Sequence, residues 1–388
     1  MSSQANLATD WRAGYGPIAH RSETIERMQA LVQRLVAQRR IADEASAHAL
    51  LAAADRVACT AMSVVAHMTY ARRIDRSGCP LGSDDFKQTP EGHTGGSLNM
   101  VPAFVGYLLA NALTGTTRGW LMGQGHCVAA IEAVNALTGD VSAAQRGRYD
   151  RSEAGLSRLI ADFYSYAIDK QGRPAVPLGS HAGPNTAGAI SEGGYLGFAG
   201  LQYVHTPLPG ESLVAFLSDG AFEEQRGSDW APRWWRAEDC GFAIPVMILN
   251  GRRIEQRTQI VQEGGATWLA EDLRHNGFDP VIVDGRDPMA IAWAIVEAED
   301  TLSAFAARSD RRYPVKLPYV IAETEKGFGF PGAATNAAHN LPLNGNPRED
   351  AQAREAFNAG AAALFVPESE LENALTVLAN HGQSQRSR

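Results

Sequence analysis

The sequence has few cysteines and no excess of positive charge. Its 388 residues include four cysteines, and no two of them form the C-x-x-C spacing of a zinc knuckle or a redox dithiol. This favours free thiols in a reducing compartment over a disulfide framework. Lysine and arginine number 35 against 43 aspartates and glutamates, for a net charge of −8. We expect such an acidic chain to bind neither nucleic acid nor an anionic membrane, because both attract basic surfaces.

The chain also lacks internal repeats, low-complexity segments and runs of like charge. We identify no uncharged apolar run that approaches the ~18 residues of a membrane-spanning helix. The N-terminal stretch MSSQANLATDWRAGYG has no apolar segment suited to secretion. These absences predict a soluble, cytoplasmic protein.

Apolar side chains at helical spacing are frequent. With 45% hydrophobic residues, a chain of this length can bury a full core. The spacing predicts a helix over 22–40, an alanine-rich helix over 44–70 and a third over 98–112. Further helices are predicted at 126–138, 152–166, 192–205, 265–276, 288–307, 349–364 and 368–380.

Short apolar runs alternate with these helices beyond residue 115. We interpret them as strands at 120–122, 213–217, 244–249, 280–283 and 319–322. Uninterrupted apolar strands separated by helices are typical of a parallel sheet covered on both faces. The predicted fold is therefore α/β, a doubly wound, mostly parallel sheet with helices on both faces. Ligands of such sheets bind at the carboxyl ends of strands, so polar residues that follow strands are candidates for the functional site.

Two predicted strands are followed by residues that suit a divalent cation, SDG at 218–220 and NG at 250–251. Asp219 and Asn250 are 250 − 219 = 31 positions apart, which leaves room for a helix between two parallel strands. Carboxylate and amide oxygens at one sheet edge suit Mg²⁺ when phosphates complete its coordination. The glycines would allow the backbone to approach a diphosphate. The alternative is that both are ordinary turn residues after strands.

This stretch and its neighbours resemble the thiamine-diphosphate enzymes. The signature of that class is GDG, about thirty residues and then Asn, and here Ser218 replaces the first glycine. The segment EGHTGGSL at 91–98 resembles the GH-x-G-G-S-L segment of transketolases and the matching segment of phosphoketolases. Further segments resemble phosphoketolases in the same order: MGQGHCVAAIEA, YDRSEAGLSRLIADF, PLGSHAGPNTAGAISEGGYLG, LNGRRIEQRT, TEKGFG and NAAHNLPL. Residues 90–345 are thus similar to the N-terminal, diphosphate-binding part of the phosphoketolase/transketolase family.

The resemblance implies Mg²⁺ and thiamine diphosphate as cofactors. The metal ligands implied are the side chains of Asp219 and Asn250 and the backbone carbonyl of Arg252. The cofactor contacts implied are Gly125, Gly220, Glu192 and Asn250. Glu192 could equally cap a helix. Lys326, in TEKGFG, could contact a phosphate or be a surface lysine.

Four histidines fall in the matched segments, namely His93, His126, His181 and His339. Cleavage of a sugar needs a base for a hydroxyl proton and donors for developing oxyanions. Neutral imidazole suits both roles near pH 7, so we interpret these four as catalytic. A single histidine is more often structural, and the other six are interpreted as structural.

The resemblance also implies a division of labour between chains. This chain would be the diphosphate-binding subunit of a split enzyme that cleaves the C2–C3 bond of a ketose or ketose phosphate. A separate pyrimidine-domain chain would supply the glutamate that activates the cofactor, in a hetero-oligomer of α2β2 type. Alternatives are a ketose-phosphate epimerase or isomerase on the same scaffold, a 2-oxoacid dehydrogenase alpha chain, and a non-catalytic cofactor-binding module.

Two departures from phosphoketolases concern the chemistry. Ser191 stands where phosphoketolases have a histidine. The phosphoketolase stretch GHGGP corresponds here to residues 125–129, so that Cys127-Val128-Ala129 follow His126. If those positions assist dehydration of a two-carbon intermediate, simple two-carbon transfer of transketolase type is the more natural outcome. We expect three parts along the chain: a helical N-terminal extension over 1–75, the diphosphate-binding domain over 76–345, and a helical C-terminal segment with a polar tail over 346–388.

Overall fold

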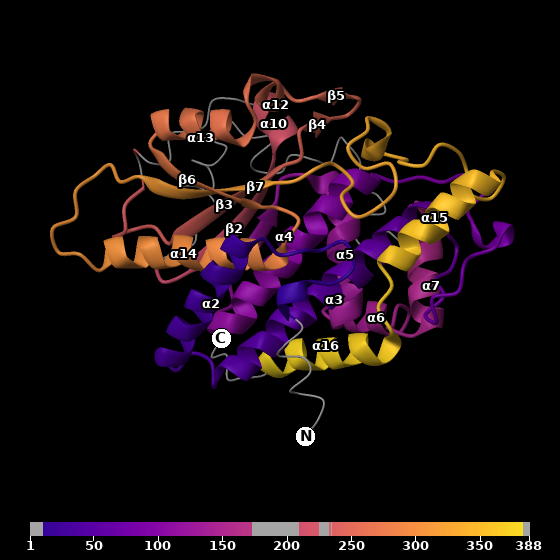
Figure 1. Cartoon of the computed structure of the whole chain (residues 1–388), viewed down its shortest axis with the longest axis horizontal. Coiled ribbons are helices and arrows are strands. Elements are labelled where there is room, and N and C mark those ends of the chain that lie inside the picture. Colours follow the sequence, from indigo (N-terminus) through magenta and orange to yellow (C-terminus); the bar gives the residue numbers. More distant parts are fainter. Residues whose placement is uncertain (1–10, 173–208, 225–232, 234, 383–388) are drawn as a thin grey trace.

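The computed structural model describes residues 11–172, 209–224, 233 and 235–382 (Figure 1). Its main sheet has five strands in the spatial order β1-β2-β3-β7-β6, and every neighbouring pair is parallel. The strands are β1 Gly119–Met122, β2 Ser212–Ser218, β3 Phe242–Leu249, β6 Phe278–Asp284 and β7 Leu317–Glu323. All five predicted strands are confirmed, as is the α/β fold with a parallel sheet.

Most predicted helices are present, with ends that shift by a few residues. The helix predicted over 192–205 lies outside the described residues. The long helices are α2 Ser22–Ala37, α3 Glu44–Tyr70, α4 Thr94–Thr114, α5 Val128–Thr138, α7 Glu153–Asp162, α13 Ala266–His275, α14 Pro288–Ala306, α15 Ala351–Ala363 and α16 Glu368–Gly382. Shorter elements are α6 Ala143–Arg146, α10 Asp219–Glu224, α12 Gln259–Glu263, and the antiparallel pair β4 Arg252–Arg253 and β5 Gln256–Arg257.

Helices cover both faces of the sheet (Figure 1), with α13 on one side and α14 and α4 on the other. Alternate side chains of β2 enter the two cores: Val214 and Phe216 join the larger one, whereas Ala215 and Leu217 join the smaller one. At the centre of the sheet both faces are buried, and β3 is apolar at every position, as the sequence predicted.

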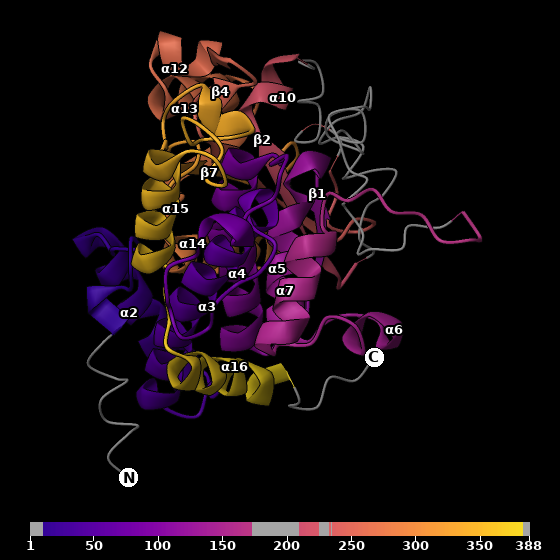
Figure 2. The same cartoon turned by 90° about the vertical axis from the view of Figure 1, so that its right-hand side faces the viewer.

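The larger core is built around α3 and α4, which lie side by side in both views (Figures 1 and 2). Every residue from Leu50 to Tyr70 is buried, so this helix is enclosed on all sides. Among the described residues, α3 and α4 are each long and apolar enough to cross a membrane, and the expectation that no segment approaches this length is wrong. In each helix 94% of the most apolar 18-residue stretch is buried inside the protein. The apolar side chains of both helices therefore pack against the rest of this chain.

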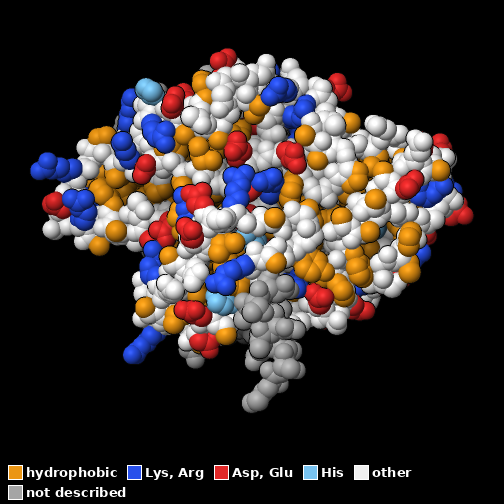
Figure 3. Space-filling view, in the orientation of Figure 1, with side chains coloured by type: hydrophobic (Ala, Val, Ile, Leu, Met, Phe, Trp, Pro, Cys, Tyr) orange, Lys and Arg blue, Asp and Glu red, His pale blue; other side chains and the backbone are white. Residues whose placement is uncertain are grey.

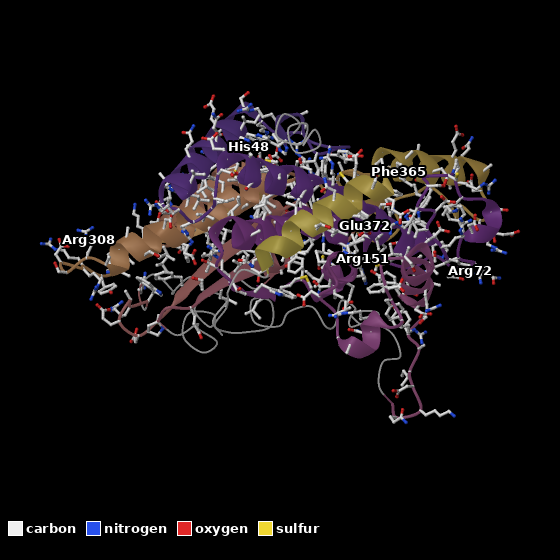
Figure 4. All side chains as sticks on the ribbon, turned by 90° about the horizontal axis from the view of Figure 1, so that it is seen from below. His48, Arg72, Arg151, Arg308, Phe365 and Glu372 are labelled. Atoms are coloured by element: carbon white, nitrogen blue, oxygen red, sulfur yellow. The ribbon has the colours of Figure 1, made fainter. Side chains whose placement is uncertain are left out.

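The C-terminal helix α16 packs across the end of this helical layer. Glu372 on α16 lies beside Arg151, with 3.7 Å between a carboxylate oxygen and a guanidinium nitrogen (Figure 4). On the face seen in Figure 3, positive and negative side chains are interspersed, in keeping with the modest net charge.

Candidate functional site

A cavity of about 270 Å³ lies where the carboxyl ends of the central strands meet the N-terminus of α4. Parallel α/β sheets bind ligands at this edge, because the loops that follow the strands converge there. Seven of the predicted site residues line it: His93, His126, Asp219, Gly220, Asn250, Arg252 and His339. Gly125 lies one residue before His126, at the start of a 3₁₀ turn. His181 and Glu192 lie outside the described residues.

Asp219 anchors the polar end of the cavity. It follows β2 directly, is 1% exposed, and accepts hydrogen bonds from the backbone N–H of Gly251 at 2.7 Å and of Gly220 at 3.0 Å. Burial raises the pKa of its carboxyl to about 7, although these backbone bonds and Lys326 oppose the rise. A carboxylate in this environment gains from a nearby cation.

Asn250 follows β3, and its side-chain oxygen accepts from the backbone N–H of Arg252 at 3.1 Å. The backbone carbonyl of Arg252 in turn accepts a hydrogen bond from the ammonium of Lys326 at 3.2 Å. Lys326 is 3% exposed, so the surface-lysine interpretation is wrong. Burial lowers its pKa, and Asp219 opposes this. A signal was available, because TEKGFG follows a predicted strand as SDG and NG do.

The donor set at this end fits a hard divalent cation. The oxygens of Asp219, Asn250 and the Arg252 carbonyl belong to adjacent strand ends, and oxygen is the ligand atom that Mg²⁺ takes. Within the described residues, no group of three His, Cys, Asp or Glu side chains is placed to hold a metal. A metal here would therefore depend on an amide and a carbonyl. Arg253 also lines the cavity, and together with Lys326 it supplies positive charge that suits a diphosphate.

Three of the predicted histidines form a triangle at the other end. The ring centroids of His93 and His126 are 5.4 Å apart, those of His93 and His339 5.6 Å, and those of His126 and His339 5.7 Å. Burial lowers the pKa of all three, and Lys326 lowers it further. Neighbouring histidines add to this for His126 and His339, whose pKa falls to about 3, whereas Asn340 and Glu91 oppose the fall for His93. All three imidazoles are therefore neutral near pH 7.

Two of these imidazoles, which line the cavity, have a buried nitrogen with no hydrogen-bond partner among the described residues. The Nδ1 atoms of His93 and His339 are buried and make no hydrogen bond to any described residue. A buried polar atom without a partner costs about 1–3 kcal/mol. Polar atoms of a ligand bound here would remove that cost, as they would for Gln124, which follows β1 and has a buried side-chain oxygen in the same condition.

The glycine pair of EGHTGGSL explains how the two ends come together. A Cβ on Gly95 would lie 2.2 Å from the carbonyl oxygen of Ala338 and 3.0 Å from Cγ of Lys326. A Cβ on Gly96 would lie 2.7 Å from Sγ of Cys127. The first turn of α4 therefore touches the loops that carry Lys326, His339 and His126, and only glycine permits this contact.

Sequence reasoning assigned neither Gln124 nor Arg253 to the site and named Cys127 only as a departure from phosphoketolases, yet all three line the cavity. Gln124 and Cys127, both 2% exposed, line it, and Arg253 lines it from the short strand β4. Their positions carried a partial signal, since Gln124 follows a predicted strand and Arg253 lies three positions after Asn250. Nothing in the sequence separates such residues from ordinary loop positions until the loops are brought together.

A parallel sheet with a polar cavity at the carboxyl ends of its strands is the arrangement typical of ligand-binding α/β proteins. The family described as XFP N-terminal domain matches residues 46–367, and the chain belongs to this family. A probable phosphoketolase of Mycolicibacterium paratuberculosis is 28% identical over 335 residues, covering 79% of this chain and 40% of that protein. A probable phosphoketolase of Streptomyces coelicolor is 32% identical over 228 residues, covering 52% of this chain and 27% of that protein.

These relatives confirm the predicted membership of the phosphoketolase/transketolase family. The chain spans at most 40% of the length of these two curated relatives. Among solved structures, a transketolase variant of Pichia stipitis is similar with a TM-score of 0.48 and 16% identity, covering 85% of this chain and 44% of that chain.

Proposed function

We propose that this chain binds thiamine diphosphate and Mg²⁺ and forms the diphosphate-binding half of the active site of a cytoplasmic ketose-cleaving enzyme. The reaction is cleavage of the C2–C3 bond of a ketose or ketose phosphate, of phosphoketolase or transketolase type. The observation that carries the proposal is one cavity that joins the oxygen ligands of Asp219 and Asn250 to three neutral histidines. Membership of the family supports it.

Each end of the cavity has its own role in this proposal. Asp219, Asn250 and the Arg252 carbonyl hold Mg²⁺, while the backbone at Gly220 and the ammonium of Lys326 face the diphosphate. Thiamine diphosphate, when bound, supplies a carbon nucleophile and an electron sink. Gly125 and Glu192 remain proposed cofactor contacts.

The histidines act on the sugar. A neutral imidazole accepts a hydroxyl proton through its free nitrogen or donates its N–H to a developing oxyanion. The Nδ1 atoms of His93 and His339 have this capacity available, because no described residue uses them. His126 completes the triangle, and His181 is proposed to join the group.

The cofactor also requires a carboxylate beside its aminopyrimidine ring. Among the described residues that line the cavity, Asp219 is the one carboxylate, and it is already bonded to two backbone N–H groups beside the proposed metal ligands. We therefore propose that a pyrimidine-domain partner chain contributes the missing glutamate, in a two-fold symmetric α2β2 assembly. The chain alone is then expected to bind cofactor weakly and to cleave no ketose.

The residues that follow His126 favour two-carbon transfer over dehydration of the two-carbon intermediate. Cys127, Val128 and Ala129 follow His126, and all three are buried at the start of α5. None of them offers a strong hydrogen-bond donor or acceptor side chain. A step that needs a polar group at this position would have to take it from elsewhere, which favours transketolase-like transfer.

The test is reconstitution with a pyrimidine-domain chain. The two chains are co-purified and assayed on donor ketose phosphates with Mg²⁺ and thiamine diphosphate, with and without inorganic phosphate and with aldose acceptors. Formation of acetyl phosphate would indicate a phosphoketolase, and transfer to an aldose a transketolase.

The matched control is the same assembly with Asp219→Ala, which should neither turn over nor retain the cofactor in calorimetric titration. Unchanged cofactor affinity in this variant would refute the site. Turnover by the purified chain, with the partner shown to be absent by mass spectrometry, would refute the need for a partner.

A further inference from the structure

The hydrogen bond between Lys326 and Arg252 involves the very oxygen assigned above to the metal. The ammonium of Lys326 lies 3.2 Å from the carbonyl oxygen of Arg252. The same ammonium interacts electrostatically with Asp219, the other principal ligand. Lys326 thus interacts with two of the three groups proposed to hold the divalent cation.

Lys326 is held in this position by buried contacts. Asn99, on α4, donates from its side-chain nitrogen to the carbonyl of Glu325 at 2.7 Å and accepts from the N–H of Gly327 at 3.4 Å. These bonds fix the backbone on both sides of Lys326, and Gly95 packs against its Cγ atom. Lys326 has few alternative rotamers at 3% exposure, so its bond to the carbonyl is a feature of the packed loop.

An ammonium and a divalent cation do not share this carbonyl favourably. A carbonyl oxygen has two lone pairs, so hydrogen-bonding capacity alone permits two partners. Two cations on one oxygen, however, lie within a few ångströms of each other in a buried site, where their repulsion is poorly screened. The metal therefore binds at the cost of the Lys326 bond.

Resting on the proposed function, we propose that Lys326 and the divalent cation are alternative partners of the Arg252 carbonyl, and that Lys326 makes metal binding conditional on a diphosphate. A bound diphosphate offers the ammonium an anionic partner of its own. The carbonyl is then released to the metal. Metal and diphosphate consequently bind with positive coupling, and Lys326 carries part of that coupling free energy.

Removing the positive charge of Lys326 should change the affinity for the metal and the affinity for the diphosphate in opposite directions. In Lys326→Met, Mn²⁺ alone should bind to the full chain about 10-fold more tightly, because its competitor is gone. Thiamine diphosphate in the presence of Mn²⁺ should bind at least about 10-fold more weakly, because the diphosphate loses a cationic partner. A residue with a purely structural role would weaken both.

The measurement is titration with Mn²⁺ of the full chain assembled with its pyrimidine-domain partner, followed by the electron paramagnetic resonance signal of the free ion, with and without thiamine diphosphate. Arg252→Met is the matched control. It removes a positive charge from the same cavity lining but keeps the carbonyl and Lys326, so its affinity for Mn²⁺ alone should rise much less than that of Lys326→Met. Lys326→Gln serves as the second variant if Lys326→Met does not fold.

The outcomes separate the two proposals. Equal or weaker binding of Mn²⁺ alone by the Lys326 variants overturns the inference, as does an Arg252→Met effect of the same size. If thiamine diphosphate promotes Mn²⁺ binding in the wild-type chain, the proposed function stands even when the inference fails. If neither wild type nor variants bind Mn²⁺ under any of these conditions, both fail.

Discussion

At the scale of the residue, burial sets the protonation of the cavity. The pKa of His126 is lowered to about 3 mainly by burial, then by His93, His339 and Lys326. The pKa of His339 is lowered to about 3 by burial and Lys326. Because these groups stay neutral in the folded chain while unfolded histidine titrates near pH 6.5, stability falls as the pH drops from 6.5 toward 3. Neutral imidazoles at pH 7 are the form that proton transfer needs.

The first prediction at this scale concerns substrate chemistry. His339→Ala, and likewise His181→Ala, should lower kcat of the assembled enzyme by ~10²–10⁴, the usual size of a general acid–base contribution. Affinity for the cofactor, measured by calorimetry, should change little, since neither histidine is a proposed metal ligand.

His275→Ala is the control, because His275 is an exposed histidine at the end of α13 whose Nδ1 lies 2.7 Å from the backbone carbonyl of Glu271. It should leave kcat unchanged. Lower thermal stability with normal turnover per folded molecule in the His339 variant would instead make that residue structural.

At the scale of the element, the first turn of α4 organises the site. Gly95 and Gly96 let this turn touch the loops after β7 and β1, and Asn99, one turn further along, bonds the loop that carries Lys326. Thr94 adds a hydrogen bond from its hydroxyl to the carbonyl of Asn340 at 2.7 Å, next to His339. One helix end thereby fixes the relative positions of the lysine and the histidine.

A prediction at this scale is the effect of Gly95→Ala. Helix propensity alone would favour alanine by about 0.5–1 kcal/mol. The new methyl group would instead meet the carbonyl of Ala338 at 2.2 Å, and such overpacking typically costs about 1–3 kcal/mol. The methyl group would push the loop that carries His339 away from Lys326. Turnover of the assembled enzyme should therefore fall by about 10² or more.

Gly82→Ala is the matched control, because a Cβ there has its nearest contact at 3.8 Å and the φ angle is −85°. It should fold and turn over normally. Thermal melts together with cofactor titration test both variants, and a more stable, fully active Gly95→Ala protein would contradict the steric argument.

At the scale of the whole molecule, a buried charge cluster joins distant parts of the chain. His20, before α2, bonds Asp55 on α3 at 3.0 Å and Asp287 before α14 at 2.9 Å, and all three side chains are at most 1% exposed. Burial alone would lower the pKa of His20, but its bonds to Asp287 and Asp55 raise it to about 10. The imidazolium therefore pairs with two buried carboxylates and ties the N-terminal segment to both helices.

His20→Ala should lower the free energy of unfolding by about 3–5 kcal/mol, because it leaves two buried carboxylates without their cation. The folded pKa lies above the unfolded value of about 6.5, so the stabilisation is complete below pH 6.5 and is lost as the pH rises toward 10. Urea unfolding from pH 6.5 to 10 should show the difference between wild type and variant shrinking. A difference that is constant over this range would show that His20 folds as the neutral form.

Much of the architecture follows from local sequence pattern. The five strands were predictable because both faces of the sheet are buried, which leaves apolar runs such as 244–249 that few other structures produce. The helix at 44–70 was predictable from its alanine content, and in the structure Asp43 caps it by accepting from the N–H of Ser46. What this pattern did not reveal is that α3 and α4 are buried on all sides, since burial depends on what packs around a helix.

The sequence by itself determined the family segments, the strand ends at Asp219 and Asn250, and the histidines, because each depends on residues close together in the chain. Only the tertiary structure decided that His93, His126 and His339 meet as neutral groups, since packing brings His339 to the other two across 339 − 126 = 213 positions or more. The tertiary structure also decided the position of Lys326, which the sequence alone could not assign either to the surface or to the site. A long flexible side chain takes its role from the oxygen that it reaches in the packed loop, and that oxygen belongs to a residue 74 positions away.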